Sequence, residues 1–276
     1  MRIIKIILKT FVFIFLTFLT QIGGLVYLLS LLIFKQIDKK INNKASRVFS
    51  KLILFFALYS IATFVIVPII AKPFGRVQLP VMEKNHLKPL SFFTCFLNRN
   101  YVRSELRNSA LEVAIKMNNK FPGTTLNYLD ANFPFINGFP LVPHLSHNDG
   151  KKLDFAFFYI DKRTGMQTNK TPSAIGYGVS EVPRVNENNT AEICAQKGYW
   201  QYSLLMKIVP QSNKQNFTFD STRTKELVNL FIEQPAIGKI FIEPHLKARL
   251  KLSSDKIRFH GCQAVRHDDH VHVQLK

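Results

Sequence analysis

Two long uncharged segments near the amino terminus constrain this chain more than any other feature of its sequence. The 25 residues from Thr10 to Phe34 contain no charged side chain, and neither do the 20 residues from Leu52 to Ala71. At about 1.5 Å of rise per residue, either segment can cross a hydrocarbon core of about 30 Å as a helix. Core helices are seldom uncharged for so long, and the apolar region of a signal peptide has only about 7–15 residues. We therefore predict a membrane anchor in residues 1–72, with transmembrane helices at about 10–34 and 52–71.

The distribution of basic residues predicts how this anchor is oriented. Residues 35–51, between the two segments, carry six Lys or Arg and one Asp, whereas the amino-terminal tail carries Arg2, Lys5 and Lys9. Lys and Arg in short loops favour the cytoplasmic side of a membrane. The tail opposes the loop but is outnumbered by it, so we expect the loop in the cytoplasm and the carboxy-terminal region outside.

The remaining sequence predicts a linker followed by one domain. Residues 73–95 contain Pro73, Pro80 and Pro89 and are expected to form an extended linker, and residues 96–276 suffice for one well-filled core. Net charge is +19, and residues 73–276 carry 27 Lys or Arg against 17 Asp or Glu. This excess is typical of a Lys-rich surface, or of a face for cell-wall polymers, lipid head groups or nucleic acid. The chain has three cysteines, which permit at most one disulfide and lack zinc-finger spacing.

The fold class that we expect is α+β, an antiparallel sheet with flanking helices. Apolar residues at helical spacing predict one helix over 104–118 and a second that begins at Asp220 or Ser221. Apolar runs at 153–160, 239–243 and 271–275 predict strands. Helices and strands are mixed without regular βαβ alternation, which favours an antiparallel arrangement.

The residues that can carry chemistry gather in two short segments. PHLSHNDGKKLDFAFF (143–158) contains His147 and Asp154 in the pattern H-x-x-G-x-x-x-D, and RHDDHVHVQL (266–275) contains His270 and His272. His270 and His272 are two apart on a predicted strand, so their side chains share a face. If the two predicted strands are neighbours, His147, Asp154 and one histidine of this pair converge. Two imidazoles and one carboxylate are a common ligand set for catalytic zinc, which activates water as the nucleophile.

Neither segment alone is specific for a metal site. The first pattern occurs by chance in many chains, and the second also suits a solvated polar terminus. Both lead into apolar strands, which favours a metal site, and neither contains cysteine, which argues against a closed structural zinc site. The sequence contains no H-E-x-x-H, no phosphate-binding glycine-rich loop and no G-x-S-x-G.

Taken together, the two segments resemble the motifs of penicillin-insensitive murein endopeptidases. This family belongs to the zinc peptidase superfamily of lysostaphin, D-Ala-D-Ala carboxypeptidases and Sonic hedgehog. Residues 146–150 with Asp154 are similar to the first family motif, and residues 267–272 to the second. The resemblance covers about residues 100–276 and implies a zinc peptidase-like domain. Family members are typically soluble periplasmic proteins with several disulfides, unlike this chain.

The resemblance also implies a role for each histidine of the two segments. His147, Asp154 and His272 would bind Zn²⁺, and His144 would touch the metal or the substrate. His270 would act on the attacking water or stabilise the transition state, and His267 would assist it.

The function that the resemblance implies is hydrolysis of peptidoglycan peptides by a membrane-tethered zinc metallopeptidase similar to murein DD-endopeptidases. The domain would face the periplasm from a bacterial inner membrane, with peptidoglycan as its substrate and the lipid bilayer as the partner of the two amino-terminal helices. The alternative is a non-catalytic, metal-stabilised module that binds cell wall, as in the hedgehog branch. We expect no nucleic acid partner, because the sequence lacks the carboxylate-rich site typical of divalent-metal phosphoryl chemistry.

Overall fold

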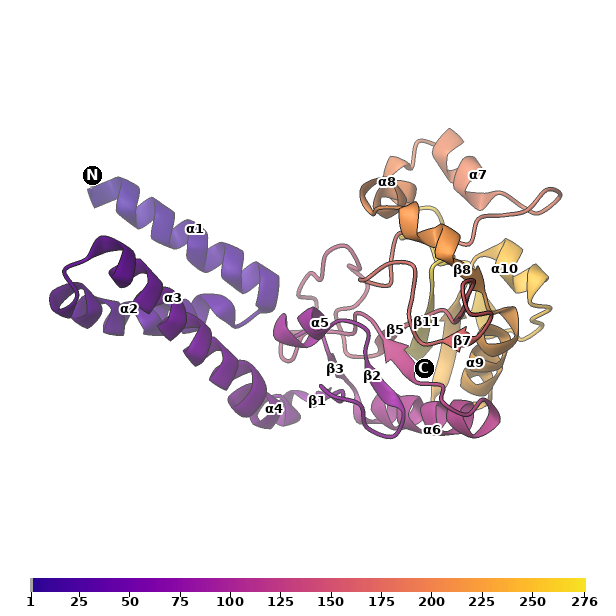
Figure 1. Ribbon diagram of the computed structural model, residues 1–276, viewed down its shortest axis with the longest axis horizontal. Coiled ribbons are helices and arrows are strands. Elements are labelled where there is room, and N and C mark those ends of the chain that lie inside the picture. Colours follow the sequence, from indigo (N-terminus) through magenta and orange to yellow (C-terminus); the bar gives the residue numbers. More distant parts are fainter. Residues whose placement is uncertain (1) are drawn as a thin grey trace.

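The uncharged amino-terminal segments form three antiparallel helices beside an α+β domain (Figure 1). The computed structural model describes residues 2–276. The helices are α1 (Arg2–Thr20), α2 (Gly23–Lys40) and α3 (Lys44–Ile61), and α3 continues through a π-helical turn (Ala62–Ile66) into α4 (Val67–Ile70). Two of the helices in this part of the chain are long and apolar enough to cross a membrane, Ile3–Thr20 and Lys44–Ile70.

The prediction of one transmembrane helix at 10–34 is wrong, because this segment breaks at Gln21. Gln21 has a left-handed backbone (φ 67°), and the Thr20 hydroxyl just before it bonds to the Leu16 carbonyl oxygen, which loosens the last turn of α1. Gly24 then lets α2 approach α1 closely, since a Cβ atom there would lie 2.0 Å from Thr17 Oγ1. The segment therefore folds back as a helical hairpin. The second predicted segment is helical as predicted, from its start at Leu52 to Ile70.

This hairpin places the amino terminus and the α2–α3 turn at the same end of the helices, remote from the domain (Figure 1). Lys5 and Lys9 of α1 therefore lie at the same end as the basic residues of 35–51. The basic residues of the amino-terminal tail and those of the loop therefore favour placing the same end of the helices in the cytoplasm.

Residues 73–95 do not form the predicted linker but belong to the folded domain. Leu79 and Leu87, which lie among the prolines, are buried in its core. The short strand β2 pairs in parallel with β4, and β1 pairs with β3. The segment contains a 3-10 turn (Lys72–Phe74), β1 (Val77–Gln78) and β2 (Leu87–Pro89), and α5 (Phe92–Phe96) and β3 (Tyr101–Val102) follow.

The central sheet has six strands in the order β10-β9-β11-β5-β4-β2. The prediction of an antiparallel sheet is correct for the four inner strands only, because β10 and β2 pair in parallel at the two edges. Crossovers that contain α6 and α10 (Pro244–Arg249) join these parallel partners, as parallel pairing requires. The remaining strands are β4 (Leu126–Tyr128), β5 (Lys152–Ala156), β9 (Ile237–Phe241), β10 (Ile257–Arg258) and β11 (His270–Leu275).

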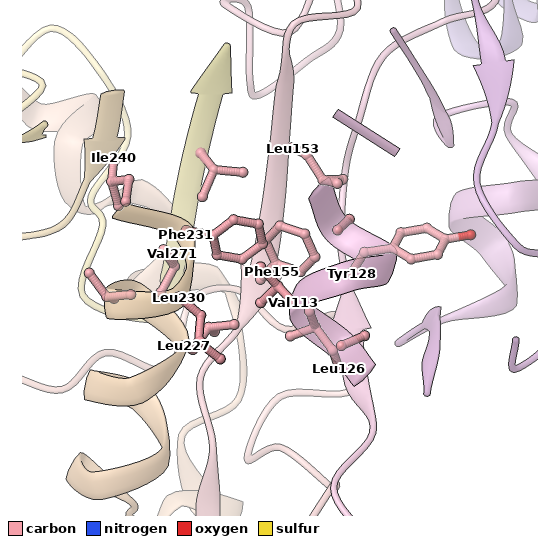
Figure 2. Packing of buried hydrophobic residues seen from close by; sticks show 14 of the residues in the cluster. Val113, Leu126, Tyr128, Leu153, Phe155, Leu227, Leu230, Phe231, Ile240 and Val271 are labelled. Atoms are coloured by element: carbon pink, nitrogen blue, oxygen red, sulfur yellow. The ribbon is translucent and has the colours of Figure 1, made fainter. Parts of the chain in front are cut away.

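Helices α6 (Ser104–Lys120) and α9 (Ser221–Glu233) pack on one face of this sheet, and both were predicted (Figure 2). Asp220 caps α9, since its side chain accepts a hydrogen bond from the Arg223 backbone. The ring of Phe231 on α9 lies 4.8 Å from that of Phe155 on β5. Val271 enters the same core from β11, so the residues that alternate with these on both strands face away from the helices.

A second, smaller sheet and several short helices make up the rest of the domain. The predicted strand 153–160 is divided between β5 and β6, which belongs to a second sheet of order β7-β6-β8. A disulfide joins Cys194 to Cys262, and Cys95 is a buried free thiol. These elements are β6 (Tyr159–Asp161), β7 (Gln167–Thr168), α7 (Thr190–Gln196), a 3-10 turn (Trp200–Ser203), α8 (Leu204–Ile208), a 3-10 turn (Ser212–Asn216) and β8 (Phe217–Phe219).

Candidate metal centre

The two segments that resemble the peptidase motifs meet on adjacent antiparallel strands. Asp154 of β5 is directly opposite His272 of β11, and His270 is opposite Ala156. His270 and His272 thus project from the face of the sheet that α6 and α9 leave free, beside Asp154. All three side chains are almost fully buried. The convergence expected from the sequence is present in the structure.

His147 reaches the same point from the loop between β4 and β5. Its Nδ1 lies 2.7 Å from the Ala131 carbonyl oxygen, to which it donates, so that Nε2 is free to bind a metal. The return of this loop to β5 depends on Gly150, which has a φ of 79°. A Cβ atom there would lie 2.6 Å from the Arg76 guanidinium group.

Three ligand atoms thereby surround one point. His147 Nε2 lies 3.4 Å from Asp154 Oδ1 and 3.1 Å from His272 Nδ1, and His272 Nδ1 lies 2.9 Å from Asp154 Oδ1. Asp154 Oδ1 is buried and has no hydrogen-bond partner among the described residues, although two imidazoles face it. This buried His/Asp/His group is able to hold a metal ion, and its donor set is one that suits zinc.

The second oxygen of Asp154 faces a second group of potential ligands. Asp154 Oδ2 lies 3.6 Å from His270 Nε2 and 3.9 Å from His144 Nδ1. Each of these histidines has its own carboxylate, since His270 Nδ1 lies 2.5 Å from Asp269 Oδ1 and His144 Nδ1 lies 3.1 Å from Asp130 Oδ2. His144, Asp154 and His270 also form a potential metal group, which shares Asp154 with the first.

Tyr177 completes the arrangement, and the sequence did not single it out. Its hydroxyl donates to Asp154 Oδ2 (2.8 Å) and accepts from the Asp130 backbone N–H (3.0 Å). Its ring lies 4.5 Å from that of His144 and 4.9 Å from that of His270. Tyr177 stands between two glycines in a loop that matches neither motif, so only the fold brings it to the site.

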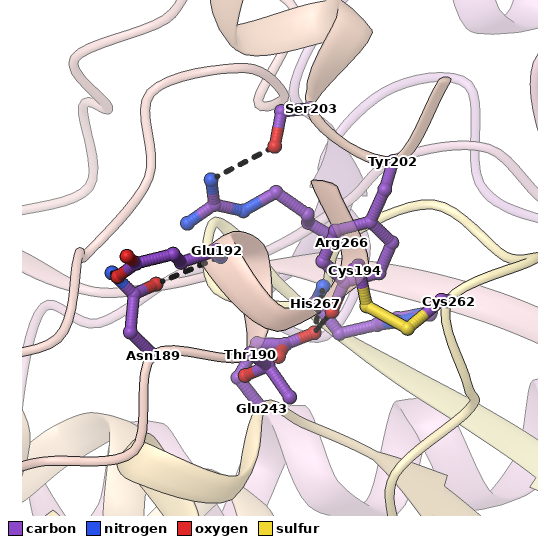
Figure 3. The surroundings of a disulfide bond; sticks show 10 residues. All are labelled: Asn189, Thr190, Glu192, Cys194, Tyr202, Ser203, Glu243, Cys262, Arg266 and His267. Carbon is purple, nitrogen blue, oxygen red and sulfur yellow. Dashed lines mark hydrogen bonds between the residues drawn. A yellow bond between two sulfur atoms is a disulfide. The ribbon is translucent and has the colours of Figure 1, made fainter. Parts of the chain in front are cut away.

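His267 lies beside the centre without entering either ligand group. Its ring is 4.9 Å from that of His270 and 5.5 Å from that of His272. The backbone N–H of His267 donates to Glu243, whose carboxylate also accepts from Thr190 and Tyr202 (Figure 3). The Cys194–Cys262 disulfide lies next to this network and ties α7 to the chain just before the second histidine segment.

Electrostatics distinguish His267 and His272 from His270. Burial lowers the pKa of His272 to about 3 and holds the pKa of His267 well below its usual value, with help from neighbouring imidazoles. Burial also acts against charge on His270, but Asp154 and Asp269 outweigh it and raise the pKa of His270. Burial likewise opposes ionisation of Asp154, and the nearby imidazoles outweigh it, so that the pKa of this carboxyl is well below its usual value. Burial thus disfavours a proton on His272 and His267, whereas the two carboxylates favour a proton on His270.

No protein-family model matches this chain, and no curated protein is significantly similar to it.

Proposed function

We propose that this protein is a membrane-anchored zinc metallopeptidase that hydrolyses peptide bonds of peptidoglycan. The observation that carries the proposal is the convergence of His147 Nε2, Asp154 Oδ1 and His272 Nδ1, with His270 directly beside them. A zinc ion bound by these three residues would polarise a peptide carbonyl group and activate water.

His270 is the residue suited to move protons. The hydrogen bond from Nδ1 to Asp269 fixes the ring, and Nε2 points toward the metal centre without a hydrogen-bond partner in the described chain. In this position Nε2 can take a proton from the attacking water and return it to the leaving amine. His267 assists from the adjacent position, where it stays neutral.

Tyr177 and His147 are held in ways that keep the ligand atoms aligned. Tyr177 donates to Asp154 Oδ2 and leaves Oδ1 to the metal, and the Ala131 carbonyl oxygen fixes the tautomer of His147. Hydrogen bonds of this kind orient metal ligands in general. We infer that His144, which is bound to Asp130, contacts the metal or the substrate.

The proposed substrate follows from the motifs and the location. The pair of motifs resembles murein endopeptidases, and basic residues gather at the end of the helices remote from the domain, which favours that end in the cytoplasm. The domain would then face the periplasm of a bacterial inner membrane, where peptidoglycan lies. Within this proposal we expect the specificity of a DD-endopeptidase.

The test is digestion of purified cross-linked peptidoglycan by the full-length protein in detergent with zinc, followed by mass analysis of the products. We expect smaller muropeptides from the wild type and from His86→Gln, a histidine variant outside the centre, but none from His270→Ala. Release of muropeptides at the same rate by His270→Ala would contradict the proposed mechanism.

One observation favours the alternative of a non-catalytic cell-wall-binding module, namely the nearly complete burial of the centre. The same experiment separates the two functions. A zinc-loaded wild type that sediments with peptidoglycan but releases no muropeptide would be a binding module.

A further inference from the structure

The domain exposes apolar side chains where it adjoins the last membrane helix. Helix α5 exposes Phe92 and Phe93, which are 56% and 71% accessible. The helix beside it exposes Val65, Ile66, Ile69 and Ile70, and Phe74 follows after the turn. We refer to these seven residues as the α5 face.

The contacts of α5 give its depth relative to the helix that crosses the membrane. The uncharged segment between Lys51 and Lys72 is 20 residues long and spans about 30 Å as a helix. Phe64 lies eight residues before Lys72, roughly 12 Å inside this segment, and its ring stacks on that of Phe92 at 5.6 Å. Tyr59 is deeper by five residues, and the Phe96 ring contacts it at 5.0 Å. If the helix spans the bilayer, α5 lies within the hydrocarbon layer.

Polar groups at this depth are enclosed in protein, as a membrane location requires. Asn98 is fully buried and donates to the Tyr59 hydroxyl (3.2 Å) and to Thr63 Oγ1 (3.4 Å). Gln21, at the tip of the α1–α2 hairpin, is 9% accessible and accepts a hydrogen bond from the Phe135 backbone N–H (2.9 Å). A surface that faces water exposes polar groups and buries apolar ones. This part of the protein does the opposite.

If the helix spans the bilayer, the hairpin tip and the domain meet within the hydrocarbon layer. The hairpin tip supplies Ile22 and Val26 to a buried cluster with Tyr59 and Val67, and the domain supplies Tyr101 to the same cluster. The helices thus share a core with the domain and do not merely tether it.

A cavity is lined both by Phe93 of the α5 face and by two residues that contact the metal centre. Its volume is about 170 Å³, and one end is formed by Asp130 and Tyr177, which contact the centre directly. Most of the remaining wall is apolar, and Ser91, Thr94 and Arg99 add polar groups to it. The apolar lining residues are Phe93, Leu97, Pro143, Ile175 and Leu205.

We propose that the α5 face lies among the acyl chains of the outer half of the bilayer and that the cavity admits an apolar chain from the membrane. The occupant to which we commit is a lipid chain, because Phe92 of this face stacks on Phe64 of a helix that is long and apolar enough to cross a membrane. A last step rests on the proposed function: the metal centre receives peptide substrates that are anchored in the membrane by a lipid.

The test uses fluorescence of the full-length protein in vesicles of phosphatidylethanolamine and phosphatidylglycerol. Trp200 is the one tryptophan, so Trp200→Phe provides a background for single new tryptophans. Phe93→Trp reports the α5 face, and Val185→Trp is the matched control, since Val185 is an apolar residue that is 90% accessible on a loop of the domain. We expect lipids brominated on their acyl chains to quench most of the emission of Phe93→Trp and iodide to quench only Val185→Trp.

Two other results would overturn the inference. Quenching of Phe93→Trp by iodide would show that the face meets water, and protection from both quenchers would show that a second copy of the chain covers it. Ile175→Trp tests the cavity in the same way, because brominated chains must quench it if the cavity opens to lipid. Quenching of Ile175→Trp by iodide alone would refute the lipid entry route. None of these measurements depends on catalysis, so a failure of the proposed peptidase activity remains distinguishable.

Discussion

Asp154 uses its two carboxylate oxygens for different purposes. Oδ1 faces His147 and His272 and has no hydrogen-bond donor among the described residues, while Oδ2 accepts from Tyr177 and faces His270. The residue that is central to the metal group is thus also the residue that couples this group to His270. Replacement of Asp154 should therefore reduce zinc binding and turnover more than replacement of any one of these three histidines.

The first prediction concerns metal content. Replacement of His147, Asp154 or His272 by Ala should sharply lower the zinc bound per chain, because three protein ligands leave none to spare. Elemental analysis of the purified full-length variants measures this, with His86→Ala as a control that should keep its zinc. Full zinc occupancy in all three variants would refute the ligand assignment.

The second prediction separates the proposed catalyst from the ligands. His270→Ala should retain zinc but lose turnover by about 10²–10⁴-fold, the usual contribution of a general acid–base group. His267→Ala should have the same effect in milder form. If zinc is lost from His270→Ala, then His270 belongs to the ligand set, as its place in the second potential group with His144 permits.

For single residues, the sequence predicts the position of those side chains that lie on regular strands. The pair His270 and His272 could be placed on one face because strand periodicity fixes it, and Asp154 follows from the same argument on the neighbouring strand. Tyr177 and Asp130 could not be predicted in this way. They reach the centre through loops, whose course depends on tertiary packing.

At the scale of elements, the main difference from prediction is the α1–α2 hairpin. Hydropathy alone cannot distinguish a 25-residue span from two shorter antiparallel helices. The local signals were Gln21 and the two glycines that follow it, of which Gly24 allows the close approach of the helices. The edge strands of the sheet were missed for a similar reason, since β2 and β10 are only three and two residues long and carry no periodic pattern.

The third prediction tests the hairpin in the membrane. Cysteines introduced at Lys5 and at Asn42 should both react with an impermeant maleimide from one side of intact vesicles, and a cysteine at Val185 should react from the other. The wild type provides a silent background, because Cys95 is buried and Cys194 and Cys262 are bonded to each other. Labelling of positions 5 and 42 from opposite sides would show that residues 10–34 cross the membrane once.

At the scale of the whole molecule, the helices and the domain form one continuous structure. The segment expected to be a linker contributes Leu79 and Leu87 to the core of the domain, and Tyr59 and Tyr101 belong to a core shared with the helices. The sequence could not indicate this, because prolines among scattered lysines are typical both of linkers and of irregular packed segments. If the helices span a membrane, their packing on the domain fixes the distance between the metal centre and the bilayer, so the proposed activity should be confined to substrate close to the bilayer.

The fourth prediction concerns how a chelator and penicillin affect the activity of the full-length protein. Penicillins inhibit by acylating a serine nucleophile, whereas the proposed reaction depends on zinc and His270 and offers them no such nucleophile. Cleavage of cross-linked muropeptides by the full-length protein should therefore be abolished by a chelator, restored by added zinc and unaffected by penicillin. Mass analysis of the digests measures each condition, and the His270→Ala variant, which should stay inactive after zinc is restored, controls for contaminating peptidases. Activity that survives thorough chelation, or that penicillin blocks, would exclude a zinc peptidase.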